Sequence, residues 1–178
     1  MKTGLFLLLF SSAILAAELH GPHTHGEMEL LILWQDNELQ MNFVAPAKDL
    51  IGYERNPKTA REKKALRKFD EKYDPFKMIS INPQAHCEFI QGKTSSDMFS
   101  AMPHKDSFFG KTHTHKIGVK GHIDFLIHYQ YKCESKPELR FNIFQLAPSI
   151  KKINIHDGII GGEVITTLTK DNNRYLVE

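Results

Sequence analysis

The segment from residue 121 to residue 133 constrains the fold most strongly, because apolar and mostly polar side chains alternate along it without a break. The apolar positions are Ile123, Phe125, Ile127, Tyr129, Tyr131 and Cys133. A period of two places these side chains on one face of a β-strand and the polar ones on the other. Such a strand is typical of an antiparallel sheet with one buried face, so we expect the chain to be rich in antiparallel β-structure.

Other segments predict the elements around this strand. Residues 27–44 indicate a strand, a turn at 35–37 and a return strand. A helix is expected after Asn56, which can cap it, with an apolar stripe formed by Leu66, Phe69 and Tyr73. Further strands are predicted at residues 77–81, 86–91, 139–143, 159–169 and 174–177. Residues 93–120 have no sustained apolar period and predict an exposed loop that contains histidines.

These elements predict an α+β fold, mainly antiparallel β with one clear helix. Residues 38–43 and 138–143 have similar sequences, and an Ala-Pro pair follows each of them. The similarity suggests an internal duplication, with hairpin units at about 24–92 and 121–178. Chance is the alternative explanation, because the identities are few.

The first 17 residues are typical of a secretory signal peptide. Lys2 is followed by an apolar run and then by small residues, with cleavage expected after Ala16 or Ala17. The mature chain, residues 18–178, is then expected to be a single exported domain without membrane insertion. In an oxidising compartment Cys87 and Cys133 are predicted to form a disulfide, and a pair of metal-binding thiolates is the alternative.

Composition excludes several classes of protein. Of the 178 residues, 41% are hydrophobic and 25% are charged, which is ordinary for a globular chain and unlike a disordered, collagenous or coiled-coil protein. The formal net charge of +2 argues against nucleic-acid binding as the main function. The basic residues of the predicted helix are interpreted as a solvated face. The one unusual feature of the composition is the number of histidines, which is ten.

The histidines are clustered, and the sequence His-Thr-His occurs at 23–25 and again at 113–115. In an extended chain a spacing of two points both rings to one side, where they can converge on one ion, and Glu27 has the same parity. Neutral imidazole is a preferred ligand of zinc, which takes four donors, or three with an open position. The candidate metal ligands are His23, His25, His104, His113, His115, His122 and Asp124. His128 could be a ligand or a solvated residue, and His156 is expected in a surface turn.

No enzyme motif is present in the sequence, and we expect a protein without catalytic activity. Two alternatives to a metal carrier remain open. One is an exported β-rich protein-interaction module in which the histidines have no metal role. The other is a zinc hydrolase, which would need an open coordination position and a general base that no motif supplies.

A series of short motifs gives the chain a family resemblance. In order they are His23-Thr24-His25-Gly26, Glu38-Leu39, Ala45-Pro46, Gly52-Tyr53-Glu54, Pro57, Cys87, His122-x-Asp124 and Tyr131-x-Cys133. In their order and spacing the chain resembles the ZrgA-like family of zinc-regulated periplasmic zinc-binding proteins. The resemblance implies a periplasmic location, zinc binding, and a part in zinc uptake during zinc shortage beside an ABC transporter.

The sequence departs from the family pattern in two places. Arg55 stands where family members often have histidine, and the predicted loop has only three histidines and two aspartates. A single well-formed zinc site is therefore expected rather than a large store of ions.

Overall fold

The computed structural model describes residues 24–100, 104–105, 112–113, 123–156 and 163–178. The predicted signal peptide lies outside these residues. The strands are β1 (Glu27–Gln35), β2 (Glu38–Pro46), β3 (Ile79–Ile81), β4 (Glu88–Ser95), β5 (His104–Lys105), β6 (Thr112–His113), β7 (Asp124–Lys132), β8 (Glu138–Phe141), β9 (Lys152–His156), β10 (Val164–Thr169) and β11 (Arg174–Leu176). The helices are α1 (Ala47–Ile51), α2 (Ala60–Arg67), α3 (Phe69–Lys72), α4 (Pro75–Met78), the 3₁₀ turn η1 (Pro83–Ala85), α5 (Asp97–Ser100) and α6 (Ile143–Leu146).

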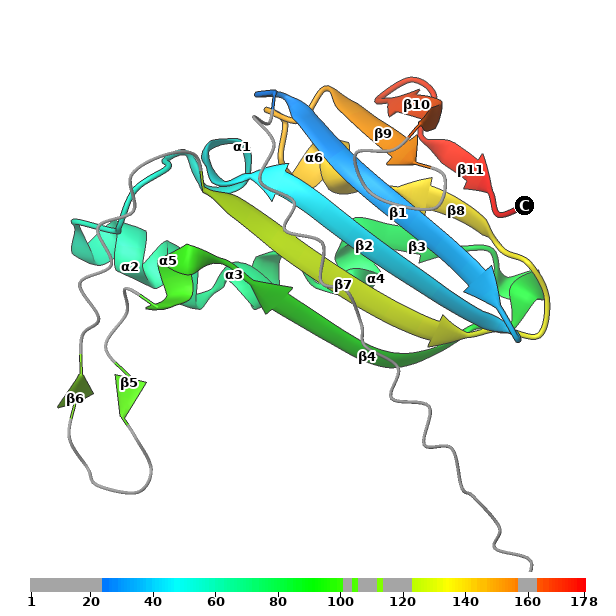
Figure 1. Cartoon of the computed structure of the whole chain (residues 1–178), viewed down its shortest axis with the longest axis horizontal. Helices are drawn as coiled ribbons and strands as arrows, with labels where there is room; N and C mark the ends of the chain where they lie inside the picture. Colours follow the sequence, from blue (N-terminus) through cyan, green and yellow to red (C-terminus); the bar gives the residue numbers. More distant parts are fainter. Residues whose placement is uncertain (1–23, 101–103, 106–111, 114–122, 157–162) are drawn as a thin grey trace, which may run out of the picture.

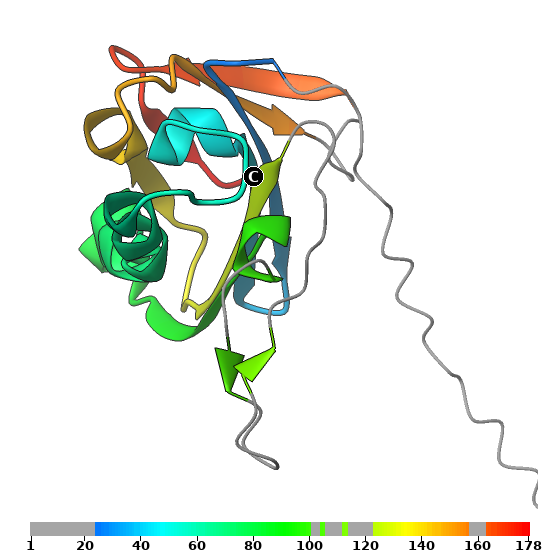
Figure 2. The same cartoon turned by 90° about the vertical axis from the view of Figure 1, so that its left-hand side faces the viewer.

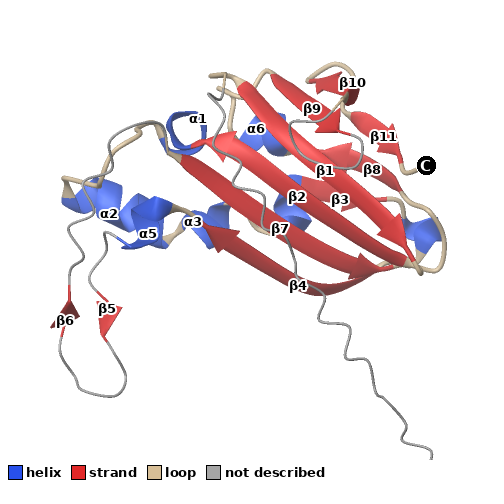
Figure 3. Cartoon of the chain, in the orientation of Figure 1, coloured by secondary structure: helices blue, strands red, loops and turns tan. Residues whose placement is uncertain are grey.

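The described strands form one large sheet and two small ones. The large sheet has six strands in the order β10-β9-β1-β2-β7-β4, and only the β1–β9 pair within it is parallel. A second sheet has the order β11-β8-β3, and β5 pairs with β6 in a separate ladder. The prediction of an α+β fold dominated by antiparallel strands is confirmed (Figure 3).

The core lies between the six-stranded sheet and a layer made of helices and the three-stranded sheet. Figures 1 and 2 show α1, α2, α3 and α6 on the same side of the large sheet as β8. The inward side chains of the large sheet are buried because every second residue faces this layer. They include Met28, Leu30, Met41, Phe43, Phe125, Ile127, Tyr129, Ile153 and Ile155. Phe69 of α3 stacks on Phe125 of β7, with ring centroids 4.0 Å apart.

The first hairpin and the central strand match their predictions. β1 pairs with β2 around a turn in which Asp36 and Asn37 have φ angles of 51° and 65°. Two consecutive residues with positive φ are typical of the tight turns that connect antiparallel strands, and Asn and Asp tolerate this conformation best after glycine. β7 buries its apolar face as the alternation predicts, and it lies between β2 and β4.

The second predicted hairpin is not formed. β7 pairs with β2 on one side and with β4 on the other, whereas β8 belongs to the three-stranded sheet. Because both edges of β7 already have backbone partners, no edge remains for β8. The pairing of residues 124–132 with residues 138–141 was therefore predicted wrongly. The division into two duplicated units stays a prediction.

The helix and the loop begin later than predicted. Thr59, rather than Asn56, caps α2, because its hydroxyl accepts from the backbone N–H of Glu62 and the Glu62 carboxylate accepts from the backbone of Thr59. Lys68 then separates α2 from α3. The predicted loop at 93–120 is also shorter, since β4 continues to Ser95 and α5 follows with Met98 buried.

The sequence analysis missed β9 and misplaced its last residue. Ile153 and Ile155 alternate with polar residues and are fully buried against the neighbouring strands. His156, expected in a surface turn, instead ends β9, where it is buried and contacts the carboxylate of Glu29. A five-residue strand with two apolar positions gives too weak a pattern to identify without knowledge of its partners β1 and β10.

The predicted disulfide is confirmed. Cys87 lies just before β4 and Cys133 just after β7, and their sulfur atoms are bonded. The bond therefore joins two neighbouring strands of the large sheet at the end where β7 finishes. Within the described part of the chain, no helix has the length and apolar character needed to cross a bilayer.

Candidate metal site

Three strand ends meet at one corner of the six-stranded sheet, opposite the end that carries the disulfide. β1 begins there, β2 ends there and β7 begins there, because β1–β2 and β2–β7 are both antiparallel. In the register of the sheet, Pro46 at the end of β2 lies opposite Asp124 at the start of β7. α1 follows β2 directly, so its side chains lie at the same corner (Figure 1).

His25 lies in a tight turn that enters β1 at this corner. The backbone N–H of Glu27 donates to the carbonyl of Thr24 across the turn. Gly26 has a φ angle of 84°, a conformation that favours glycine, and its N–H donates to a carboxylate oxygen of Asp49 at 2.8 Å. The carbonyl of Gly26 accepts from the N–H of Lys151 at 2.7 Å. The residue that follows His25 is therefore fastened to two other segments of the chain.

The His25 side chain faces two carboxylates. Its Nδ1 is 3.5 Å from Oδ2 of Asp49, which belongs to α1, and 3.7 Å from Oε1 of Glu54. The imidazole is 41% exposed, whereas the Asp49 and Glu54 side chains are only 9% and 15% exposed. An ion can thus reach the imidazole from solvent and find two negatively charged groups behind it. We call His25, Asp49 and Glu54 the corner cluster.

The donor atoms and their spacing in the corner cluster suit zinc. Zinc binds imidazole nitrogen and carboxylate oxygen at about 2.0–2.2 Å, so two ligand atoms of a tetrahedral ion are about 3.4 Å apart. The two distances from His25 are close to this value. Among the described residues, no group of three or more His, Cys, Asp or Glu side chains is arranged so that it could hold a metal ion by itself. The corner cluster would therefore hold part of a coordination sphere, with further donors supplied by neighbouring segments.

Glu27 does not extend the His25 face as its parity had predicted. The turn at Gly26 interrupts the extended backbone, so the period of two does not continue across it. The Glu27 carboxylate instead contacts Lys152 at 3.2 Å and Asn154 at 3.1 Å, both on β9. Glu27 is thus part of the polar face of β1 and β9 rather than of the corner cluster.

Asp124 and the segment before it enter the same corner. Asp124 is half-buried at the start of β7, and the carbonyl of the preceding Ile123 accepts from the N–H of Ala47 at 2.8 Å. Ala47 is the first residue of α1, two positions before Asp49. His23 and His122, two further predicted ligands, lie outside the described residues, but each is adjacent in sequence to a described residue of this corner.

The second His-Thr-His sequence lies in a different region. His104 of β5 pairs with His113 of β6 in the backbone register of their two-stranded ladder, which is separate from both larger sheets (Figure 1). His115 lies outside the described residues. The ladder thus brings the backbones of two predicted ligands together and does not connect them to the corner cluster.

Arg55, which stands where members of the resembled family often have histidine, is paired with Glu62 of α2. Its guanidinium makes two contacts with the Glu62 carboxylate, at 2.7 Å and 3.2 Å, and lies over the ring of Tyr53. The hydrogen bond from Arg55, together with backbone N–H groups of Thr59 and Lys58, lowers the pKa of Glu62 to about 2. This ion pair fixes the chain on either side of Glu54, because Tyr53 also donates to the carbonyl of Glu62.

The two remaining strand histidines have protein partners on the polar face of the large sheet. Nδ1 of His128 is 2.8 Å from the side-chain oxygen of Asn42, and burial lowers the pKa of His128. His156 contacts Glu29, whose carboxylate also accepts from Asn154. Neither histidine is brought to the corner cluster by the strand register.

Sequence reasoning did not identify Asp49 and Glu54 as site residues. Asp49 belongs to a five-residue helix with no periodic signal, and Glu54 follows that helix in irregular structure. The pairing of β1 with β2 brings the residues before β1 close to those after β2, so Asp49 contacts Gly26 although the two are 23 positions apart in sequence. The predicted hairpin contained a usable signal, because carboxylates shortly after its second strand lie at the same end of the hairpin as a histidine just before its first strand.

Comparison with known proteins agrees with this chemistry. The family described as ZrgA family zinc uptake protein matches residues 22–176. The match covers most of the chain, and the chain belongs to this family of zinc uptake proteins. No curated protein matches the sequence. Membership indicates a role in zinc uptake through binding or transport, and it agrees with imidazole and carboxylate groups at the corner.

Proposed function

We propose that this protein is an exported zinc-binding protein that captures zinc in the periplasm and assists its delivery to an ABC transporter when zinc is scarce. The observation that carries the proposal is the corner cluster, in which an accessible imidazole faces two shielded carboxylates at the spacing of zinc ligands. Family membership supports zinc as the ion. The signal-like N-terminus and the disulfide support export.

We propose that the remaining ligands come from the histidines next to the corner. His23 precedes His25 by two residues, and His122 precedes Asp124 by two. The hydrogen bond between Ala47 and Ile123 supports this assignment, because it fixes the chain one residue after His122 beside α1. His104, His113 and His115 would then contribute to the same ion from the second region, or bind an ion more weakly by themselves.

Zinc is proposed to be cargo rather than a structural element. The buried apolar faces of the large sheet and the disulfide lie outside the corner cluster, so the fold has a core that does not depend on metal. Strong chelation is expected to leave the circular dichroism of the sheet unchanged. Loss of the β signal on chelation would contradict the carrier function, because zinc would then be structural.

The direct test of the function is equilibrium dialysis of the mature protein against zinc in a metal buffer. Saturable binding is expected, with bound zinc removed by a strong chelator. If the disulfide-bonded, folded protein takes up no zinc, the proposal fails and the protein-interaction module without a metal role is the better account. Calcium and magnesium, which prefer all-oxygen sites, serve as control ions and should bind far more weakly.

Export and delivery need separate experiments. Mass spectrometry of protein from the periplasmic fraction should show that the mature chain begins at Ala17 or Glu18, and an uncleaved chain in the cytoplasm would contradict export. For delivery, cells that lack the protein should grow more slowly in zinc-depleted medium, and added zinc should restore growth. An unchanged growth rate would contradict a part in uptake.

A further inference from the structure

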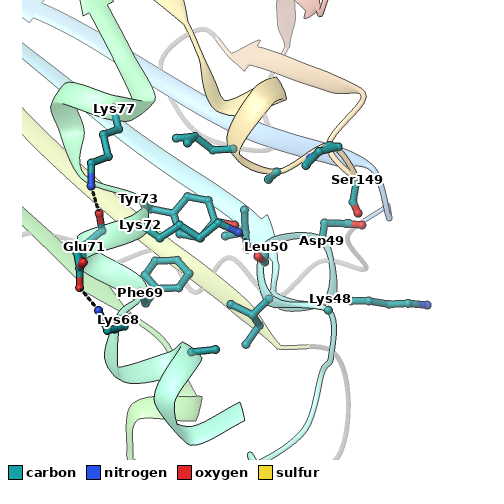
Figure 4. Close-up of a pocket in the computed structure, with 16 residues that line it drawn as sticks. Lys48, Asp49, Leu50, Lys68, Phe69, Glu71, Lys72, Tyr73, Lys77 and Ser149 are labelled. Carbon is teal, nitrogen blue, oxygen red and sulfur yellow. Dashed lines mark hydrogen bonds and ion pairs between the residues drawn. The ribbon is translucent and has the colours of Figure 1, made fainter. Parts of the chain in front are cut away.

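A groove lies beside α1 and shares Asp49 with the corner cluster. It has a volume of about 580 Å³ and is enclosed by α1, by α2 and α3, and by the chain that leaves α6 (Figure 4). Leu50, Phe69 and Tyr73 form its apolar floor and are almost completely buried. The apolar side chains that remain accessible in the groove are those of Ile51, Ala65, Leu146 and Pro148. The hydroxyl of Tyr73 donates to the carbonyl of Leu50. This hydrogen bond joins α3 to α1 across the floor of the groove.

The rim of the groove is basic, and part of its positive charge is not neutralised. Of the four lysines that line it, Lys68 contacts the Glu71 carboxylate at 2.9 Å and Lys77 donates to the Glu71 carbonyl. Lys48 and Lys72 have no carboxylate partner among the residues that the structure describes. The other acidic residue of the lining, Asp49, is turned to His25 and Gly26.

Lys72 is the most informative of these lysines. Figure 4 shows its side chain across the ring of Tyr73 with the ammonium group toward Leu50, and its Nζ is 4.7 Å from the ring centroid. Burial lowers the pKa of Lys72, because the ammonium group loses part of its hydration without gaining a counter-ion. An anion placed in the groove would restore the favourable electrostatic environment of this group.

We propose that this groove is a docking site for an acidic segment of a partner protein, with acidic side chains at Lys48 and Lys72 and apolar side chains against the accessible apolar lining of the groove. Charge complementarity selects an acidic partner. The concave apolar lining between separated positive charges suits alternating apolar and acidic side chains of a polypeptide better than a flat lipid surface or a small inorganic anion.

The groove is also connected to His25, which gives the docking site a role in zinc delivery. α1 holds Gly26 through Asp49, and the chain after α6 holds it through Lys151. Ser149 lines the groove, and its carbonyl oxygen is 3.4 Å from the position that a Cβ at Gly26 would occupy. Both walls of the groove therefore fasten the residue next to His25. This link rests on the proposed function, and it predicts that a docked segment changes zinc affinity.

The docking site can be tested by fluorescence anisotropy with a labelled twelve-residue peptide rich in Glu and Leu, at low ionic strength. The same peptide with Gln at every Glu is the control ligand. The double variant Lys48→Gln/Lys72→Gln should bind the acidic peptide about tenfold more weakly than the wild type. The matched variant Lys63→Gln/Lys64→Gln removes the same charge from the exposed surface of α2 and should stay within about twofold.

Three results would overturn the docking site. They are no binding of the acidic peptide, equal binding of the Gln peptide, and equal losses in the two double variants when circular dichroism shows both to be folded. Binding of the wild type to phosphatidylglycerol vesicles without binding to the peptide would assign the groove to a membrane surface instead.

The link to zinc is measured by repeating the zinc titration with saturating acidic peptide. Zinc affinity should change at least threefold, and the peptide affinity should change by the same factor when zinc is present. If the peptide binds and zinc does not, the proposed function fails and the docking site stands. If zinc binds and the peptide does not, the docking site fails and the proposed function stands. Binding of both without mutual effect overturns the link.

Discussion

The two His-Thr-His sequences of this chain occupy very different surroundings. The first ends at His25, which lies beside two carboxylates. Its turn is hydrogen-bonded to α1 and to the chain before β9. The second begins at His113, in a ladder of two short strands that is separate from the larger sheets. The first motif thus ends in an anchored turn beside two carboxylates, whereas for the second the structure describes only the backbone pairing of His113 with His104. Preorganisation matters because a ligand that is already held in place loses less entropy on binding.

The largest expected effect is a loss of stability that leaves zinc binding at the corner cluster unchanged. Replacing both cysteines, Cys87→Ser/Cys133→Ser, should lower the free energy of unfolding by about 4 kcal/mol, because the bond closes a loop with a sequence separation of 46. Urea unfolding of the metal-free protein measures this loss. Zinc affinity of the folded variant should change little, since the disulfide lies at the opposite end of β7. A large loss of zinc affinity in the folded variant would mean that the two ends are coupled.

The second effect uses pH to count the histidines on the ion. A free imidazole has a pKa of about 6.5, so each histidine ligand should lower the apparent zinc affinity about 30-fold at pH 5 relative to pH 7 or above. Competition with a zinc indicator across this range gives the profile for the wild type and for His25→Ala. Between pH 7 and pH 5, the apparent zinc affinity of His25→Ala should fall about 30-fold less than that of the wild type, because one histidine ligand is missing. A flat wild-type profile would point to carboxylate ligands alone.

The third effect compares the two regions directly. His25→Ala should weaken zinc binding at least tenfold, about 1.4 kcal/mol, because it removes the nitrogen ligand of the corner cluster. His113→Ala should weaken it less than about threefold. Isothermal titration calorimetry at pH 7.5 measures both. A larger loss of zinc affinity in His113→Ala than in His25→Ala would place the principal site in the β5–β6 region. It would also show that the hydrogen bonds that hold the turn at His25 do not determine zinc affinity.

A fourth effect comes from the backbone at Gly26. Gly26→Ala and Gly52→Ala both place alanine at positive φ, at 84° and 89°, and should each destabilise the fold by about 1–2 kcal/mol. Only Gly26 lies next to His25, and only there does the added Cβ approach Ser149. Zinc affinity should therefore fall in Gly26→Ala and stay unchanged in Gly52→Ala. Equal zinc affinities would show that the turn does not position His25.

The smallest effect concerns acid stability near Glu54. The pKa of Glu62 is lowered from 4.5 to about 2 by Arg55 and the helix cap, so the folded state favours the ionised form. This contribution is complete above pH 4.5 and is lost as the pH falls toward 2. Glu62→Gln should flatten the decrease in urea midpoint within this range and leave zinc affinity at pH 7.5 unchanged. A wild-type decrease that is identical in the variant would contradict the ion pair.

The parts of the fold that local patterns encode were predictable. Neighbouring residues determine the alternation in β7 and the β1–β2 turn. The pairing of Cys87 with Cys133 follows because the chain has only two cysteines. The prediction of a second hairpin was wrong because the pairing of a strand depends on segments that are distant in sequence. Here β2 and β4 pair with the two edges of β7. β9 was missed because its burial depends on β1 and β10 rather than on its own pattern.

The candidate site shows the same limit. His25 could be selected from its motif, but Asp49 and Glu54 reach it only through the pairing of β1 with β2. His156 was misjudged for the same reason, since its partner Glu29 lies on the neighbouring strand. Sequence thus indicated the kind of chemistry, and the topology of the sheet determines which carboxylates lie beside His25.

The most direct test of the account is to observe the histidine side chains while zinc is added. In ¹⁵N-labelled protein, the imidazole signals of His25, assigned with His25→Gln, should change with the first equivalent of zinc. The signals of His128 and His156 should not, because both have protein partners on the sheet. If the first equivalent shifts other histidines and leaves His25 unchanged, zinc does not bind at the corner cluster and the central claim is wrong.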